Sequence, residues 1–398
     1  MGDGPIYAVW ELTLRCDLAC GHCGSRAGRP RERELSTAEA LDLVAQMAGV
    51  GVTEVTLIGG EAYLRDDWTE IARAIRKAGM RCTVTTGGRG LTAERARAAA
   101  DAGVQSVSVS LDGMEAAHDR QRGLAGSFRA ALAAIAHLRE AGIPVAANSQ
   151  INRLSFPDFD SLLDLLISKG AHAWQVQLTV AMGRAADRFD WLLQPYELLR
   201  VIPHLAQLAE RARDNGVRFW PGNNVGYFGP YAESLMGSQA TAYRGCGAGA
   251  SVLGIEADGG IKGCPSLPSA DYVGGNVRVD SLANLLRQST PLRFTRDRTI
   301  DELWGYCRDC YYADECRAGC TWTGHVLFGR RGNNPYCHHR ALELAQIGKR
   351  ERLAPIAPAP GQPFDHGLFE IILEEADDDL RTLPATDQRQ RKRLPLLQ

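Results

Sequence analysis

Residues 128–151 read FRAALAAIAHLREAGIPVAANSQI and contain the structural unit that decides the fold. Apolar residues recur at helical spacing on one face of a predicted helix, namely Phe128, Leu132, Ile135 and Leu138. Gly142 follows, and glycine adopts the left-handed conformation that ends a helix without steric cost. A β-rich run begins at Pro144. The unit is therefore a helix, a glycine and a buried strand.

The same unit recurs through the first half of the chain. The helices end near Gly51, Gly79, Gly103, Gly142 and Gly170. The expected strands are Ile6–Leu14, Glu54–Ile58, Arg81–Thr86, Gln105–Leu111, Pro144–Ile151 and Ala173–Val180. Strands that alternate with helices predict a parallel sheet, and a complete barrel needs about eight such units. We therefore expect an α/β fold, a partial and open (β/α)6 TIM-like barrel, with a flat doubly wound sheet as the alternative. Both place the chemistry at the C-terminal ends of the strands.

Composition excludes several classes of protein. The 398 residues are 45% hydrophobic and 23% charged, which is typical of a globular chain with a sizeable core. The formal net charge of −2 argues against a nucleic-acid partner. No apolar run is long enough to span a membrane, and the N-terminus lacks the features of a signal peptide. We therefore expect a cytoplasmic protein.

The cysteines are clustered rather than dispersed. Cys16, Cys20 and Cys23 form a C-x3-C-x2-C motif directly after the first expected strand. Three thiolates can hold three irons of a 4Fe–4S cluster and leave the fourth iron open for a ligand. A zinc site is the alternative. Cys82 lies inside an expected strand and is predicted to be a buried structural thiol.

The run Cys16-Asp17-Leu18-Ala19-Cys20-Gly21-His22-Cys23 resembles the signature of the radical S-adenosylmethionine (SAM) enzymes. Ile58-Gly59-Gly60-Glu61 resembles the Gly-Gly-Glu motif of that family, which binds the methionine amino group; Ala62 stands where proline is common. Ser108 to Gly113 resembles the segment that contacts the ribose and carboxylate, and His118 to Gly123 resembles the H-D-x-x-R-G run. The resemblance implies a SAM site made by His22, Gly59, Gly60, Glu61, Ser110, Asp112, Arg122, Asn148, Met182 and Gly183. Within it, Arg122 would clamp the carboxylate and His22 would lie beside the adenine.

Seven further cysteines match the SPASM extension of radical SAM proteins, which carries two auxiliary 4Fe–4S clusters. The resemblance implies that Cys307, Cys310, Cys316 and Cys337 ligate the outer cluster, and that Cys246, Cys264 and Cys320 ligate the inner one. The fourth iron of the inner cluster is then open or takes a ligand other than cysteine. Two zinc sites are the alternative. The expected cofactors are three 4Fe–4S clusters and SAM.

These motifs divide the chain into four parts. We expect a radical SAM barrel over 1–194, a helical and loop connector over 195–240, a SPASM domain over 241–345 and a Pro-rich, charged tail over 346–398. The tail begins as a semi-rigid Pro-rich stretch, and its end is expected to be disordered.

The resemblance implies an oxidoreductase that cleaves SAM to a 5′-deoxyadenosyl radical and abstracts hydrogen from a ribosomally made peptide. The product would be an oxidative cross-link formed during maturation of a peptide natural product (RiPP maturation). The alternatives are a non-peptide substrate such as a tetrapyrrole or sugar derivative, a peptide epimerase, and a non-enzymatic metal-binding scaffold. The expected partners are a precursor peptide, a flavodoxin- or ferredoxin-type reductant and a separate peptide-recognition protein. The motifs assign no catalytic base.

Overall fold

A single sheet organises most of the molecule. The computed structural model of the chain describes residues 6–226, 228–237 and 245–377. In this part the main sheet has nine strands in the order β7-β6-β5-β4-β3-β2-β1-β8-β9. Neighbours from β7 to β8 pair in parallel, and β9 pairs antiparallel to β8. The strands are β1 (Ile6–Glu11), β2 (Val52–Ile58), β3 (Arg81–Thr86), β4 (Ser106–Ser110), β5 (Val145–Ile151), β6 (Ala173–Leu178), β7 (Arg218–Pro221), β8 (Val252–Ile255) and β9 (Ile261–Lys262).

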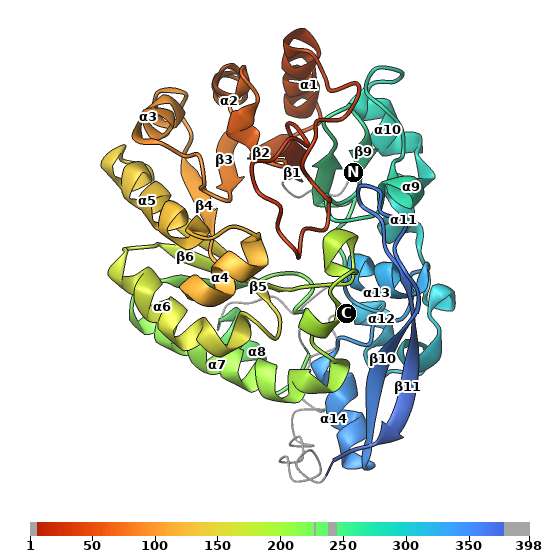
Figure 1. Cartoon of the computed structure of the whole chain (residues 1–398). Helices are drawn as coiled ribbons and strands as arrows, with labels where there is room; N and C mark the ends of the chain where they lie inside the picture. The colour runs from red at the N-terminus through yellow and green to blue at the C-terminus, as the bar shows by residue number, and fades with distance from the viewer. Residues whose placement is uncertain (1–5, 227, 238–244, 378–398) are drawn as a thin grey trace.

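The first seven helices cover the outer face of this curved sheet (Figure 1). They are α1 (Thr37–Gly49), α2 (Trp68–Lys77), α3 (Ala93–Asp101), α4 (Glu115–Arg122), α5 (Ser127–Glu140), α6 (Phe159–Ser168) and α7 (Leu198–Asp214). The N-terminus of α1 shows why such segments begin where they do: Ser36 and Glu39 form a capping box that satisfies two unpaired backbone N–H groups.

Alternation along the strands separates the core from the site. In β5, the side chains of Val145, Ala147 and Ile151 are buried in the main hydrophobic core, among Trp174 and its neighbours. The alternate residues Ala146, Asn148 and Gln150 are only partly buried. Because successive strand residues point to opposite faces, the concave face of the sheet carries polar side chains. The core therefore lies under the helices, and the site lies on the other face.

The expectation of an open barrel is confirmed, since the end strands of the described sheet, β7 and β9, do not pair with each other. The described sheet nevertheless has nine strands rather than the six expected. Residues 218–221 add β7 beside β6, and the cysteine-rich region adds β8 beside β1. These added strands have four residues or fewer, too short to show the alternation of a longer strand. The first strand also ends at Glu11, earlier than expected.

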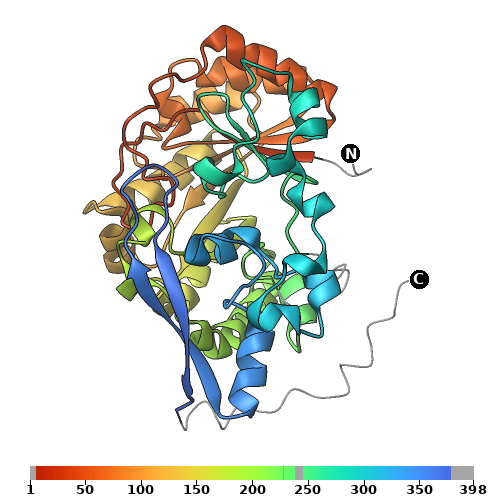
Figure 2. The ribbon, with the colours of Figure 1, turned by 90° about the vertical axis from the view of Figure 1, so that its right-hand side faces the viewer.

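The C-terminal third is built from short helices and one hairpin. The helices are α8 (Ala232–Met236), α9 (Ser269–Tyr272), α10 (Leu282–Gln288), α11 (Thr290–Asp297), α12 (Ala313–Cys316), α13 (Thr321–Phe328) and α14 (His338–Gln346). The hairpin pairs β10 (Lys349–Ala357) with β11 (Leu368–Glu375) and runs along the molecule (Figure 2). The Pro-rich stretch expected as a linker therefore forms part of a strand, and the expected disordered end lies outside the described residues from 378 onward.

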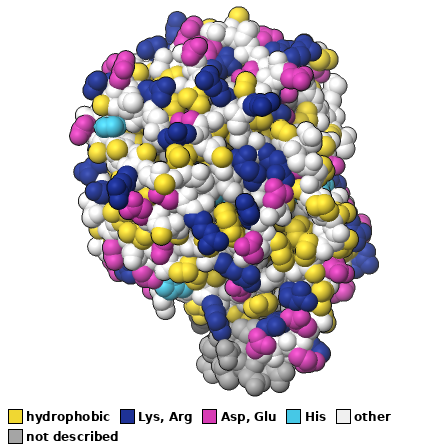
Figure 3. Space-filling view, in the orientation of Figure 1, with side chains coloured by type: hydrophobic (Ala, Val, Ile, Leu, Met, Phe, Trp, Pro, Cys, Tyr) yellow, Lys and Arg dark blue, Asp and Glu magenta, His cyan; other side chains and the backbone are white. Residues whose placement is uncertain are grey.

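Surface features complete the description. Within the described residues, no helix combines the length and apolarity needed to cross a membrane. Acidic and basic side chains are interspersed on the face shown in Figure 3.

Candidate functional site

The three N-terminal cysteines lie on a loop that is closed at its base. The backbone N–H of Cys16 donates to the carbonyl of Gly28 (3.1 Å), and that of Gly28 donates to the carbonyl of Leu14 (3.0 Å). Burial raises the pKa of the Cys16 thiol to about 12, and the neighbouring thiols Cys20 and Cys23 add to the rise. All three cysteines line one cavity, and the Cys16 thiol becomes a thiolate only beside a cation. This donor set fits a cluster with three protein ligands.

Two glycines let the segment after β2 lie directly against this loop. A Cβ atom at Gly59 would lie 2.3 Å from the carbonyl oxygen of Thr13, and one at Gly60 would lie 2.2 Å from that of Arg15. The N–H of Gly60 donates to the Thr13 carbonyl, and the N–H of Glu61 to the Arg15 carbonyl, both at 2.8 Å. Any larger side chain would push the two segments apart, and the contact fixes Glu61 beside the cysteine loop.

Glu61 is a buried carboxyl group with one unsatisfied oxygen. Its Oε2 accepts a hydrogen bond from the N–H of Gly87 (2.9 Å), and the Thr86 hydroxyl also bonds to the carboxyl. Oε1 has no hydrogen-bond partner among the described residues. Burial raises the pKa of Glu61 to about 8. A buried acceptor of this kind requires a donor or a cation from a ligand, and an amino group fits.

Asp112 is the centre of a second buried group, at the end of β4. Its Oδ2 lies 3.1 Å from Nε2 of His22 and 2.5 Å from Nη2 of Arg122, and its Oδ1 accepts from the N–H of Gln150 (2.7 Å). Burial alone would raise the pKa of Asp112, but the charges of Arg122 and His22 hold it well below its usual range. With its oxygens occupied by the protein, Asp112 is suited to orient His22 and Arg122 rather than to bind a ligand itself.

Arg122 connects this group to the cysteine loop. Its Nη1 donates to the sulfur of Cys20 at 3.7 Å. Its Nε and the Nδ1 of His22 have no hydrogen-bond partner in the described part of the chain. These two unsatisfied atoms and Oε1 of Glu61 are the polar atoms that a bound cofactor with carboxylate, amino and base groups would satisfy.

The structure brings most of the predicted residues to one cavity of about 250 Å³. The predicted residues that line it are Cys16, Cys20, His22, Cys23, Gly59, Gly60, Glu61, Ser110, Asp112, Arg122 and Asn148. The predicted set lacks several other polar residues of the wall, among them Gln150, Gln177, Ser149 and Thr86. Strand alternation is the signal that finds the first, because Gln150 stands two residues after Asn148 and so faces the same side.

Two predicted residues are not in this cavity wall. The Met182 side chain is buried, and its sulfur accepts a hydrogen bond from Nε1 of Trp322 (2.8 Å). Gly183 has a φ of +59°, and a Cβ there would lie 2.3 Å from the carbonyl oxygen of Gly24. Its N–H donates to the carbonyl of Asp365 (2.8 Å). Both residues therefore support the back of the cysteine loop.

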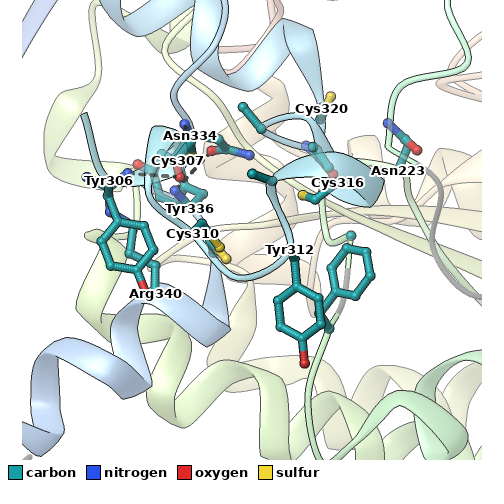
Figure 4. Close-up of a pocket in the computed structure, with 17 residues that line it drawn as sticks. Asn223, Tyr306, Cys307, Cys310, Tyr312, Cys316, Cys320, Asn334, Tyr336 and Arg340 are labelled. Carbon is teal, nitrogen blue, oxygen red and sulfur yellow. Dashed lines mark hydrogen bonds between the residues drawn. The ribbon is translucent and has the colours of Figure 1, made fainter. Parts of the chain in front are cut away.

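The C-terminal cysteines form two further groups of thiols. Cys307, Cys310, Cys316 and Cys337 line one cavity together with Tyr306, Tyr312, Tyr336 and Arg340 (Figure 4). Burial raises the pKa of Cys337 to about 12 and that of Cys316 further, and the other thiols of the group add to both shifts. The buried guanidinium of Arg340 lowers the pKa of Cys337 and so favours the thiolate. Four thiols that line one pocket beside a guanidinium group fit a fully ligated cluster.

The other group consists of Cys246, Cys264 and Cys320. Burial raises the pKa of Cys264 to about 12, and the charges of Cys246 and Cys320 raise it further. Cys320 stands immediately before α13, and in Figure 4 its sulfur points away from that of Cys316. Cys320 also lines the pocket of the other four thiols, so it lies between the two groups that the resemblance implies. Cys82 is fully buried in β3, as expected for a structural thiol.

The fold and the cysteine loop together define the class of this protein. The sequence model of the Radical SAM superfamily matches residues 10–164, and the relatives below cover most of the chain. The chain belongs to the radical SAM superfamily. Membership implies a 4Fe–4S cluster and SAM, for which the thiol loop and the unsatisfied atoms around it provide a fitting site.

Relatives with established names fall into two groups. The AdoMet-dependent heme synthase of Nitratidesulfovibrio vulgaris is 30% identical over 359 residues, 84% of this chain and 93% of that protein. The mycofactocin maturase MftC of Mycolicibacterium smegmatis is 31% identical over 321 residues, 80% of this chain and 78% of that one.

Solved structures share the fold at low sequence identity. Streptococcus suis SuiB bound to its precursor peptide SuiA has a TM-score of 0.64 at 16% identity, over 80% of this chain and 72% of that one. The structure of anSMEcpe with bound AdoMet and the Kp18Cys peptide has a TM-score of 0.68 at 15% identity. The match covers 86% of this chain and 98% of that one.

Proposed function

We propose that this protein is a radical SAM enzyme with three 4Fe–4S clusters that oxidatively cross-links a ribosomally made peptide. The supporting observation is that seven C-terminal thiols gather in the same molecule as the candidate SAM site. Cys307, Cys310, Cys316 and Cys337 line one pocket, and Cys246 and Cys320 lie near enough to Cys264 to raise its pKa. Closing a bond on a substrate that has lost one hydrogen atom releases a second electron. The two C-terminal thiol groups are where an acceptor for that electron would be held.

When bound, the N-terminal cluster and SAM supply hydrogen-atom abstraction from an unactivated C–H bond. The chain's own residues bind and orient. Oε1 of Glu61 would accept a hydrogen bond from the amino group of SAM, and Arg122 would bind its carboxylate. Asp112 holds Arg122 and His22 in place. Gln150 and Gln177 offer amide donors and acceptors along the wall.

The names of the relatives support a peptide substrate. MftC is named as a maturase, and SuiB was crystallised with its precursor peptide. The expected reductant, a flavodoxin- or ferredoxin-type protein, and a separate peptide-recognition protein are part of the same proposal.

A second candidate, an iron tetrapyrrole substrate, is favoured by one structural observation. An open recess of about 670 Å³ adjoins the SAM cavity, with which it shares Ala27 and Arg184. The arginines that line it are Arg26, Arg29, Arg31, Arg33 and Arg184. Arg26 and Arg31 are already paired with acidic side chains, so a ligand would use Arg29 and Arg33. Guanidinium groups bind carboxylates, and tetrapyrroles carry carboxylate side chains. The relatives named heme synthase and Fe-coproporphyrin III synthase point the same way.

The test is anaerobic co-expression with each short peptide encoded beside the gene, followed by mass spectrometry. A peptide lighter by two hydrogen atoms supports the proposal, and fragmentation locates the new bond. With Cys16→Ala, the peptide should keep its original mass. The control Cys82→Ala removes a thiol outside the three groups, and this variant should still modify the peptide. The purified enzyme is also given iron coproporphyrin III. Conversion of the porphyrin with every peptide unchanged would refute the peptide proposal and support the second candidate.

A further inference from the structure

The tip of the β10–β11 hairpin is packed into the molecule beside the SAM site. The carboxylate of Asp365 accepts a hydrogen bond from Nε of Arg26 (2.6 Å), which follows the cysteine loop. The ring of Phe364 lies 3.8 Å from the ammonium of the buried Lys262. Figures 1 and 2 both show the turn between the two strands close to the N-terminal loop. Whatever holds this tip therefore also holds Arg26 and, through it, the end of the cysteine loop.

Three potential metal ligands meet at this tip from three separate elements. Asp271 belongs to α9, His325 belongs to α13, and His366 belongs to the hairpin. One ligand atom from each lies within 4.8 Å of the others. Nε2 of His325 is 3.2 Å from Oδ2 of Asp271, close to the ~3.3 Å between two ligands of a tetrahedral zinc ion. The ligand atom of His366 lies within 4.8 Å of the other two.

Hydrogen bonds from the Nδ1 atoms of the two histidines leave both Nε2 atoms for the proposed site. Nδ1 of His366 lies 2.7 Å from the carbonyl oxygen of Gly367. Because a carbonyl oxygen only accepts, Nδ1 carries the proton and Nε2 keeps its lone pair. Nδ1 of His325 lies 3.1 Å from the hydroxyl of Tyr272. Outer partners that fix a histidine in this way are the usual second layer of a metal site.

We propose that Asp271, His325 and His366 bind one divalent cation of the zinc class, which fastens the hairpin tip to α9 and α13. Imidazole and carboxylate ligands suit zinc, and this site is chemically distinct from the thiol groups. Asp271 is about half exposed, so the ion has access from solvent and water can complete its coordination. The inference is independent of the substrate.

The test is equilibrium dialysis of the protein with its clusters in place against buffered free zinc, followed by elemental analysis of zinc and iron. We expect one zinc ion per chain at unchanged iron content. His366→Asn should weaken zinc binding at least ~100-fold. The matched control is His204→Asn, since Nε2 of His204 lies 2.8 Å from Oδ2 of Asp160, beside Arg211 rather than a second histidine. This control should bind zinc like the wild type.

Asp271→Asn provides a second variant, because a half-exposed side chain can be changed without disturbing the core. It should lose zinc binding as His366→Asn does. Hydrogen exchange of residues 359–367 supplies an independent readout: zinc should slow it in the wild type and not in the two variants. Three results would overturn the proposal. The wild type and His366→Asn could bind equal amounts of zinc, or zinc could bind only as iron is lost. Zinc could also bind without changing the hydrogen exchange of residues 359–367.

Discussion

The N-terminal and C-terminal thiol sites differ in what holds their cysteines. The N-terminal loop is attached to a nine-stranded sheet with a large core, and its base is closed by backbone hydrogen bonds. The four outer thiols of the C-terminal region lie among helices of four to nine residues, from which only a few side chains, such as Leu327, reach the main core. We therefore expect the first site to be formed by the protein before any metal binds. The second must draw much of its stability from the metal itself.

The largest expected effect separates chemistry from folding at the first site. Cys16→Ala removes one ligand of the N-terminal cluster, so formation of 5′-deoxyadenosine should fall to background. The sheet should stay folded, because the core of the barrel does not depend on this thiol. Anaerobic product analysis by chromatography and circular dichroism measure the two quantities. Cleavage that survives the substitution would show that the loop is not the SAM-cleaving site.

The next effect should appear at the outer thiol group. Cys316→Ala removes one of four ligands, so iron content should drop by about four atoms per chain. Hydrogen exchange should accelerate across residues 300–346, because this region lacks a large core. Cys16→Ala is the matched comparison, with a similar loss of iron and no acceleration there. Equal exchange in both variants would mean that the C-terminal region is as preformed as the barrel.

A smaller effect is expected on cofactor affinity. Glu61→Gln removes the charge that would face the amino group of SAM, which should raise the Kd about 10- to 100-fold, the worth of a charge-assisted hydrogen bond of ~1.5–3 kcal/mol. Because burial raises the pKa of Glu61 to about 8, the carboxylate fraction grows as pH rises from 7 to 9. Wild-type affinity should grow with it, and the variant should lack this dependence. Anaerobic calorimetry measures both.

The smallest effect concerns the surface between the two regions. Arg278 of the C-terminal region lies 2.5 Å from the Glu39 carboxylate of α1 and also donates to the carbonyl of Arg33. The hydrogen bond from Arg278 lowers the pKa of Glu39 to about 2. The ion pair between Glu39 and Arg278 therefore stabilises the fold fully above the unfolded pKa of 4.5, and this stabilisation is lost as pH falls toward 2.

Because the pair is exposed, Glu39→Gln should cost less than about 1 kcal/mol in the free energy of unfolding. Denaturant titration at pH 7 and pH 3 measures the loss at each pH. A loss that is as large at pH 3 would assign the effect to packing rather than to charge.

The sequence predicts the alternating helices and strands well, because long strands such as β5 show their alternation. Most of the residues that it assigns to a SAM site line one cavity, since Glu61 and Asp112 stand just after strand ends. It misses β7 to β9, which are too short for a period to appear. Met182, which the resemblance includes in the SAM site, lies outside the cavity wall and accepts a hydrogen bond from Trp322. Sequence position alone does not tell on which side of a loop a residue points.

The Pro-rich stretch shows a different failure of sequence reasoning. Pro355 pairs with Phe369 within the hairpin, although proline usually marks a linker or a break. A proline is tolerated where its missing N–H faces away from the partner strand, as at the edge of a two-stranded sheet. The contacts that hold this hairpin come from residues distant in sequence, such as Arg26 and Gln194, and no local pattern reveals them.

The pairing of β1 with β8 imposes an order on biosynthesis. Tyr7 pairs with Val252, so one edge of β1 finds its partner only after the whole barrel has been translated. At ~5–20 residues per second, that edge is exposed on the ribosome for on the order of tens of seconds. An unpaired edge strand is a template for aggregation. Expression yield should therefore depend on the pace of translation and on chaperones that cover nascent strands.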